Sequence, residues 1–357
     1  MTKSERDAYN HQLRAAAKRL GLPLRGDIES NIIRYCKEEL GKWIAAHGQP
    51  ETLTELLELV TASLNLDIKE VRDEIDLNQL LRNIPPAVEP GMALLATELD
   101  DQTDAVILQR QHHQAWERPF LAVINCRGWH ALRRYFSKWH EVVHLILDGK
   151  QLRFAFRRTP SERREPEEVL VDRIAGVLAF YPGIFEPAFR REIERAGRLS
   201  FDMVDAVRKK VAPEASRYAT LLACLRHCDH PVYFVRAKIG YKRNEEKLLA
   251  DYGTTLFPKE CPLPKPKLRV HEVAHSHAVE QLGIRIHKNM EIPQTSVVAT
   301  ALRGATGLIH RGGEKLESWR TSSTGPIGYG EIEVEAFSID EEVWALIHLR
   351  EGIRGRR

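Results

Sequence analysis

The chain has 357 residues, of which 43% are hydrophobic and 29% are charged, and its formal net charge is +3. Apolar residues are plentiful enough to build a core, so the composition excludes a disordered chain and a small scaffold that depends on disulfides. A net charge this small gives no reason by itself to expect nucleic acid as a partner. At about 100–200 residues per domain, the length predicts two or three domains.

Cysteine usage and the lack of targeting signals predict the compartment. The five cysteines are odd in number and, apart from Cys224 and Cys228, lie far apart, which is typical of a reducing environment. The first 20 residues contain no apolar stretch followed by small residues, so we predict no secretory signal. No run of about 18 apolar residues occurs in the chain. We therefore expect a cytoplasmic protein that does not bind membranes.

Residues 1–90 are predicted to form a helical N-terminal region. Apolar residues recur at helical spacing within residues 32–44 and again within residues 53–60. Two consecutive prolines, Pro85 and Pro86, end this pattern. On this pattern the whole region is helical.

Helical and strand patterns together predict an α+β protein, in which residues 91–190 form the central domain. Residues 92–97 and 104–108 fit short strands, and the apolar run at residues 120–124 fits a further strand. A long helix with many apolar residues follows at residues 129–147.

Residues 191–257 are predicted to contain a pair of helices resembling a helix-turn-helix, at residues 201–211 and 214–228. In the second helix only Arg217 and Arg226 are permanently basic, which is few for contacts with phosphates. DNA is therefore the less favoured partner of this segment.

Residues 258–357 are predicted to form a β-rich C-terminal domain. The first ten of these residues contain four prolines, which is typical of an extended linker. Apolar and polar residues alternate at residues 331–337, which favours strands. A sensory role is one candidate function for this domain.

The segment His140-Glu141-Val142-Val143-His144 carries the strongest chemical signal in the chain. On a helix, residues four apart lie about 40° apart around the axis, so His140 and His144 project from one face. Two imidazole nitrogens there can bind one Zn²⁺ at about 2.0–2.1 Å. Glu141 occupies the usual position of a base that acts on metal-bound water. The spacing therefore predicts a zinc site with Glu141 as its catalytic residue.

A catalytic zinc site of this type needs one more protein ligand. A second helix is predicted to begin at Pro166, because the missing N–H of proline costs nothing in a first helical turn. Glu168 tops one apolar face of that helix and Glu167 tops a competing face, so periodicity leaves both open as ligands. Asp172, one turn after Glu168, is placed to orient a ligand histidine.

The same motif occurs a second time, at residues 271–275, which shows how unspecific the bare motif is. This copy follows a proline-rich stretch rather than an apolar helix. Leu268, Val270 and Val273 fit an extended segment, which would separate the two histidines. We therefore predict the metal site at the first copy.

A further group of ligand-type side chains lies close together in the sequence, at Cys224, His227, Cys228 and His230. A structural zinc site needs a second pair of ligands, and that pair is missing here. We interpret Cys224 and Cys228 as buried thiols at the end of a helix.

The residues around the first copy resemble the metallopeptidase domain of the ImmA/IrrE family. Members place an Ile/Val-Asn/Asp turn and an aromatic residue before the HExxH helix, and here Ile124-Asn125 and Phe136 stand at those positions. Their second helix has the form E-x-x-A-N/D-x-F-A-x-x-L-L-x-P, and the matching residues are Glu168, Asp172, Ala175 and Leu178. The departures are Val171, Ile174 and a proline that comes one residue late, as Pro182.

The resemblance implies a minigluzincin-like fold with His140, His144 and Glu168 as zinc ligands and Glu141 as general base. It also implies a protein substrate, a transcriptional repressor that is cleaved at a specific peptide bond under stress. An alternative from another class is a DNA-binding or sensory regulator that keeps the fold without proteolysis. We further hypothesise that residues 120–124 form an edge strand, to which a substrate could add in extended form.

Overall fold

The computed structural model describes residues 3–84, 91–111, 113–148, 154–158, 165–252, 263–321, 325–350 and 352–355. The chain divides into an N-terminal unit, residues 1–192 and 205–220, and a C-terminal unit, residues 193–204 and 221–357. The expected α+β class is confirmed, with helices prominent in the first unit and an antiparallel sheet in the second. The division into four domains stays a prediction, and Pro85, Pro86, Cys261 and part of the proline-rich linker lie outside the described residues. No described helix is both long and apolar enough to cross a membrane.

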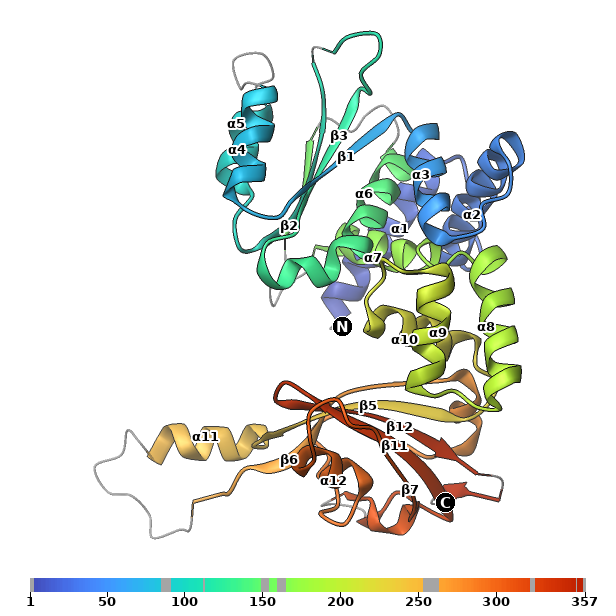
Figure 1. The fold of residues 1–357 in the computed structure, drawn as a ribbon, viewed down its shortest axis with the longest axis vertical. Coiled ribbons are helices and arrows are strands. Elements are labelled where there is room, and N and C mark those ends of the chain that lie inside the picture. The colour runs from blue at the N-terminus through green and yellow to red at the C-terminus, as the bar shows by residue number, and fades with distance from the viewer. Residues whose placement is uncertain are drawn as a thin grey trace. The chain divides into compact units, whose positions relative to one another are not determined.

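Helices open the N-terminal unit, as the sequence predicts (Figure 1). They are α1 (Lys3–Arg19), α2 (Ile28–His47) and α3 (Leu53–Ser63). The side chains of Asp27 and Thr52 accept hydrogen bonds from backbone N–H groups in the first turns of α2 and α3. These caps satisfy donors that have no partner within the helix, and so fix where α2 and α3 begin.

A strand, β1 (Leu66–Val71), interrupts the region that we predicted to be wholly helical. It belongs to a sheet with β2 (Thr103–Gln109), β3 (Phe120–Asn125) and β4 (Phe154–Arg158), in the order β1-β3-β2-β4. β1 pairs in parallel with β3, whereas β2 is antiparallel to both β3 and β4. The partner of β1 is distant in the sequence, so local periodicity gave no signal for this strand.

β3 lies inside the sheet, with a paired strand on each side, and all six of its residues are buried. The hypothesis that residues 120–124 form an open edge strand is therefore wrong. A substrate cannot add there, because the backbone groups of β3 are already used by β1 and β2. The two edges of this sheet are β1 and β4.

Helices cover both faces of this sheet (Figure 1). α4 (Glu74–Asn83) and α5 (Gly91–Glu98) pack apolar side chains against one face. α6 (Arg134–Asp148) contacts β2 and β3 from the other side, and α7 (Pro166–Leu178) packs against α6. The strand predicted at residues 92–97 is wrong, because these residues form α5, which turns Met92 and Leu95 towards the core.

Three more helices follow, α8 (Pro182–Ala196), α9 (Phe201–Val211) and α10 (Arg217–His227). α9 has the predicted bounds, and α10 begins three residues later than predicted. The Nε atom of Arg217 binds Asp205 at 3.0 Å, and Leu221 is fully buried. Part of α10 is thus committed to packing within the protein, and DNA binding by this pair stays a prediction.

Five antiparallel strands form the main sheet of the C-terminal unit and confirm the predicted β-rich region. In sheet order they are β6 (Lys267–His275), β5 (Val232–Gly240), β12 (Glu342–Leu349), β11 (Glu331–Ile339) and β7 (His310–Lys315). α12 (Val297–Arg303) packs against β11, β7 and β12. The core of the unit includes apolar residues from these strands, from α12 and from the connecting segments.

A buried carboxylate joins β11 to the beginning of α9 within the C-terminal unit. Glu335 is 1% exposed and accepts a hydrogen bond from the backbone N–H of Phe201 at 2.8 Å. Its other oxygen accepts from Nε of Arg311 at 2.9 Å. A negative charge at a helix N-terminus is favourable, and here it is also hydrogen-bonded.

Replacing Glu335 by alanine should lower the free energy of unfolding by about 1–3 kcal/mol, because the Phe201 N–H would be left without its acceptor. Urea unfolding followed by tryptophan fluorescence measures this loss. Glu331→Ala on the same strand is the control, since its 69% exposed carboxylate pairs with Arg350 in solvent and should contribute less than about 1 kcal/mol. Equal losses in the two variants would contradict a special role for Glu335.

Candidate metal centre

Two histidines project from one face of α6 into the interior of the N-terminal unit. His140 is fully buried and His144 is 5% exposed. Their Nε2 atoms lie 3.1 Å apart. Because residues four apart on a helix are neighbours, the two rings meet as the sequence predicts.

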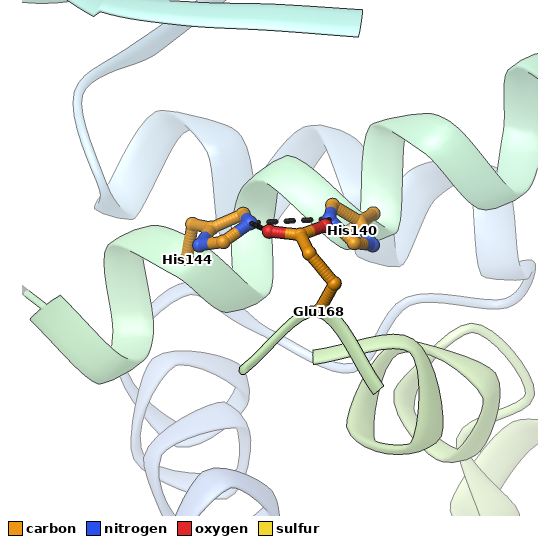
Figure 2. A group of neighbouring side chains, drawn as sticks. All are labelled: His140, His144 and Glu168. Carbon is orange, nitrogen blue, oxygen red and sulfur yellow. Dashed lines mark hydrogen bonds and ion pairs between the residues drawn. The ribbon is translucent and has the colours of Figure 1, made fainter. Parts of the chain in front are cut away.

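Glu168 of α7 reaches both rings (Figure 2). Its Oε2 atom lies 3.0 Å from Nε2 of His140, and its Oε1 atom lies 3.4 Å from Nε2 of His144. A tetrahedral ion that binds its ligands at about 2.0–2.1 Å holds the donor atoms about 3.3–3.4 Å apart. The two contacts of Glu168 involve its two different oxygens, and one donor atom from each of the three residues lies within 4.8 Å of the others, which is close enough for the three side chains to hold one metal ion. In the part of the chain that the structure describes, no other group of three ligand-type side chains converges in this way.

The structure brings Glu168, and not Glu167, to the histidines. Glu167 accepts a hydrogen bond from the guanidinium of Arg19 on α1 at 3.3 Å. The two glutamates are adjacent on α7, so they point in directions about 100° apart around the helix axis. The helical pattern allowed either glutamate as the third ligand, and the packing of α7 on α6 selects Glu168.

Carboxylates lie behind the two histidines. Oδ1 of Asp172 lies 3.0 Å from Nδ1 of His140, which confirms the expected orienting contact. When Nδ1 carries the proton and donates to Asp172, the lone pair of Nε2 faces Glu168 and is available to a metal. Oδ2 of Asp148 lies 3.9 Å from Nδ1 of His144, which is too long for a hydrogen bond but close enough for an electrostatic contact.

The shifted pKa values of His144 and Glu168 indicate that these side chains favour positive charge between them. Burial alone would lower the pKa of His144, but Asp148 and Glu168 outweigh burial and raise that pKa to about 10. Burial would likewise raise the pKa of Glu168, yet hydrogen bonds from His140 and His144 hold it well below its usual range. Such a field stabilises a cation at the point where the imidazoles and the carboxylate meet.

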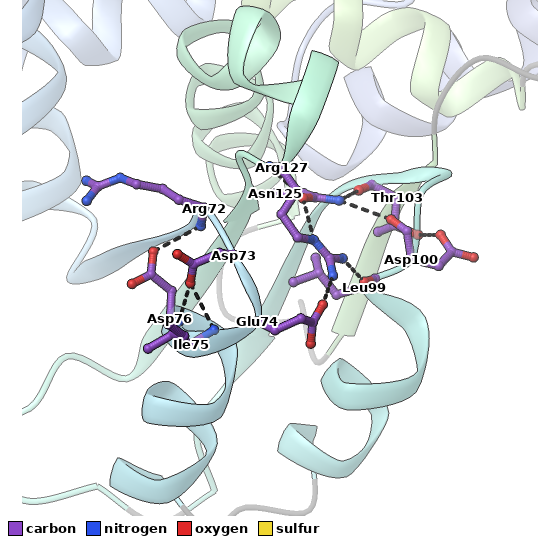
Figure 3. Close-up of polar contacts among 10 residues, drawn as sticks. All are labelled: Arg72, Asp73, Glu74, Ile75, Asp76, Leu99, Asp100, Thr103, Asn125 and Arg127. Atoms are coloured by element: carbon purple, nitrogen blue, oxygen red, sulfur yellow. Dashed lines mark hydrogen bonds and ion pairs between the residues drawn. The ribbon is translucent and has the colours of Figure 1, made fainter.

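The turn that leads into α6 is held by a polar network (Figure 3). The side-chain amide of Asn125, at the end of β3, donates to the backbone carbonyls of Asp100 and Thr103 at 3.0 and 2.9 Å. Its carbonyl oxygen accepts from the backbone N–H of Arg127 at 3.1 Å. Arg127 in turn binds Glu74 in the first turn of α4. These contacts hold the segment that follows β3 to the residues before β2 and to the beginning of α4.

The opposite face of α6 is anchored by a lysine. Lys138 is 9% exposed, and its Nζ atom lies 2.8 Å from Glu70 of β1 and 2.7 Å from Glu214 before α10. A buried ammonium needs such partners, because an unpaired charge there would cost several kcal/mol. The two ion pairs connect α6 to β1 and to the segment before α10.

The second copy of the motif lies on β6 and is extended, as predicted. On a strand, residues four apart are separated by about 13 Å, which is too far for His271 and His275 to share one ion. Glu272 instead pairs with Arg236 of β5 at 2.7 Å. This copy therefore has a structural part in the sheet of the C-terminal unit.

Cys224, within α10, and Cys228, directly after it, are buried free thiols, as we interpreted them. Burial raises the pKa of both Cys224 and Cys228. The Sγ atom of Cys228 lies 3.6 Å from the carbonyl oxygen of His230. A protonated thiol is a poor metal ligand and a poor nucleophile, so this cluster adds no second reactive site.

Comparison with known proteins gave no match, either to a family model or to a curated protein. His140 and His144, which are buried, and the partly exposed Glu168 form a group that can hold a metal ion, of the kind found in metallohydrolases.

Replacing Asp172 by asparagine should weaken metal binding by about 10–100-fold, because the amide no longer holds His140 in the ligating orientation. Competition with a chromogenic chelator measures the affinity for Zn²⁺. Glu167→Gln, on the same helix and bonded to Arg19, is the matched control and should stay within about twofold of the wild type. If both variants bind Zn²⁺ as tightly as the wild type, Asp172 has no orienting role.

Proposed function

We propose that this protein is a zinc-dependent endopeptidase that hydrolyses a peptide bond in a specific protein. The observation that carries the proposal is the convergence of His140, His144 and Glu168 on one point, with Glu141 next to the first histidine on the same helix. The likeness of this segment and of α7 to the ImmA/IrrE metallopeptidases supports the same conclusion.

The donor set favours a catalytic rather than a structural ion. Structural zinc sites are closed by four protein ligands, usually including cysteines, whereas two histidines and one glutamate leave a position open. Zn²⁺ bound there would lower the pKa of its water to about 7 and polarise the substrate carbonyl. His140, His144 and Glu168 would hold the ion, and Asp172 would fix the ring of His140.

Glu141 is placed for proton transfer. It is fully buried, and it follows His140 on α6. A carboxylate held at this position can accept the proton of the attacking water and later return it to the departing amine. Because Glu141 lies in the middle of a packed helix, its carboxylate would keep the same position during both proton transfers.

The proposed substrate is a transcriptional repressor, whose cleavage would switch on a stress response. This part of the proposal rests on the family resemblance alone. Because β3 is internal, a substrate that adds as an extra strand would have to use β1 or β4 instead.

Removal of single ligands should abolish metal binding. We expect His140→Ala and Glu168→Ala each to lose about one equivalent of metal, since two remaining donors cannot retain Zn²⁺ through purification. His271→Ala, in the second copy of the motif, should keep it. Elemental mass spectrometry of the purified proteins gives the answer, and loss of metal only in the His271 variant would place the site elsewhere.

Replacing Glu141 by glutamine should leave metal binding intact but reduce proteolysis by about 10²–10⁴-fold, because the amide cannot take up a proton. N-terminal labelling and mass spectrometry can compare cells that express the wild type with cells that express Glu141→Gln. We expect new protein N-termini only with the wild type. Identical sets of N-termini, or none with the wild type, would favour a regulator that keeps the fold without proteolysis.

A further inference from the structure

The C-terminal unit contains a cavity of about 550 Å³ that the proposed peptidase chemistry does not use. The turn before α12, the end of η4 (Leu316–Ser318) and β8 (Arg320–Thr321) line it, together with the residue before α11 (Arg243–Tyr252). The lining residues that matter here are basic or apolar, namely Lys242, His287, Lys288, Arg320, Met290 and Pro293.

Positive charge dominates this cavity. Lys242, Lys288 and Arg320 are cationic at neutral pH. Among the described lining residues the one carboxylate is Glu291, and Lys267 already pairs with it at 2.9 Å. Lys288 and Arg320 have no ion-pair partner in the described part of the chain. Lys288 and Arg320 are therefore not neutralised by a neighbouring carboxylate and attract an anion to the hollow.

Hydrogen bonds hold the turn that carries His287 and Lys288 in place. The backbone N–H of Met290 donates to the carbonyl of His287 at 3.1 Å and closes the turn. Asn289 has a φ of +68°, a left-handed conformation that few residues other than glycine adopt. Its N–H donates to Val270 of β6 at 2.7 Å, and its carbonyl accepts from buried Arg269 at 3.3 Å.

A fixed turn matters for binding. Side chains on a preformed scaffold lose less conformational entropy when a ligand arrives than side chains on a loop that must first be ordered. Strained backbone held in place by its surroundings is also common at binding sites. Lys288 is therefore presented from a preorganised position rather than from a free surface loop.

The size and lining of the cavity favour a small molecule that carries a phosphate group. About 550 Å³ lies within the range of small-molecule sites, about 300–1,000 Å³, and exceeds what a lone inorganic ion needs. Lysine and arginine together suit phosphate, while Met290 and Pro293 offer apolar contact for the rest of the ligand. We propose that this cavity binds a phosphorylated small molecule of nucleotide size.

The test is isothermal titration calorimetry of the full chain with ATP, AMP and inorganic phosphate, in low salt and with a chelator present. We expect a nucleotide to bind more tightly than inorganic phosphate. The double variant Lys288→Ala/Arg320→Ala should weaken nucleotide binding at least about tenfold, because two charge-assisted contacts are lost. Both side chains are exposed, so the fold should be unaffected, which a thermal melt checks.

The matched control is Arg285→Ala/Lys315→Ala, which removes the same charge from exposed positions of the same unit that do not line the cavity. It should bind nucleotide within about twofold of the wild type. The proposal is overturned if no nucleotide binds more tightly than about 1 mM. Equal losses in the two double variants, or much tighter binding of single-stranded RNA through the same two residues, would overturn it as well.

Discussion

Two imidazoles buried on one face of a helix impose a requirement on everything around them. Because the rings are buried away from water, the protein or a metal must provide partners for their ring nitrogens. α6 cannot supply all the partners itself, so a second helix must bring Glu168 and Asp172 within about 3 Å of His140 and His144. The separation and register of α6 and α7 are the constraint on which the architecture of the N-terminal unit depends.

The surrounding elements keep those two helices in place. Arg19, near the end of α1, bridges Asp148 on α6 and Glu167 on α7, at 3.0 and 3.3 Å. Further along α7, Arg173 binds Glu29 of α2 at 2.8 Å. α1 and α2 are thus part of the support of the candidate metal site, although neither contributes a ligand. On the other side, the sheet and the ion pairs of Lys138 fix α6 from behind.

The two units differ in the sign of the charge that gathers around their candidate sites. In the N-terminal unit, carboxylates gather around imidazoles at a point where a cation fits. In the C-terminal unit, cations gather around a hollow where an anion fits, and the second copy of the motif is used for strand pairing and an ion pair. A short motif acquires chemical meaning only through the element that carries it, because a helix brings residues four apart together and a strand separates them.

The sequence by itself determined the features that depend on local periodicity. It predicted the helix that carries His140 and His144, the extended second copy at residues 271–275, and the orienting contact of Asp172. It also indicated the β-rich C-terminal region, since alternation along single strands is visible locally.

Only the tertiary structure decided the rest. The pairing of β1 with β3, the interior position of β3 and the helical state of α5 depend on partners that are remote in the chain. The choice between Glu167 and Glu168 as the ligand also depends on tertiary structure. The helical pattern of the sequence fits either residue, and only the packing of α7 on α6 turns Glu168 towards the histidines.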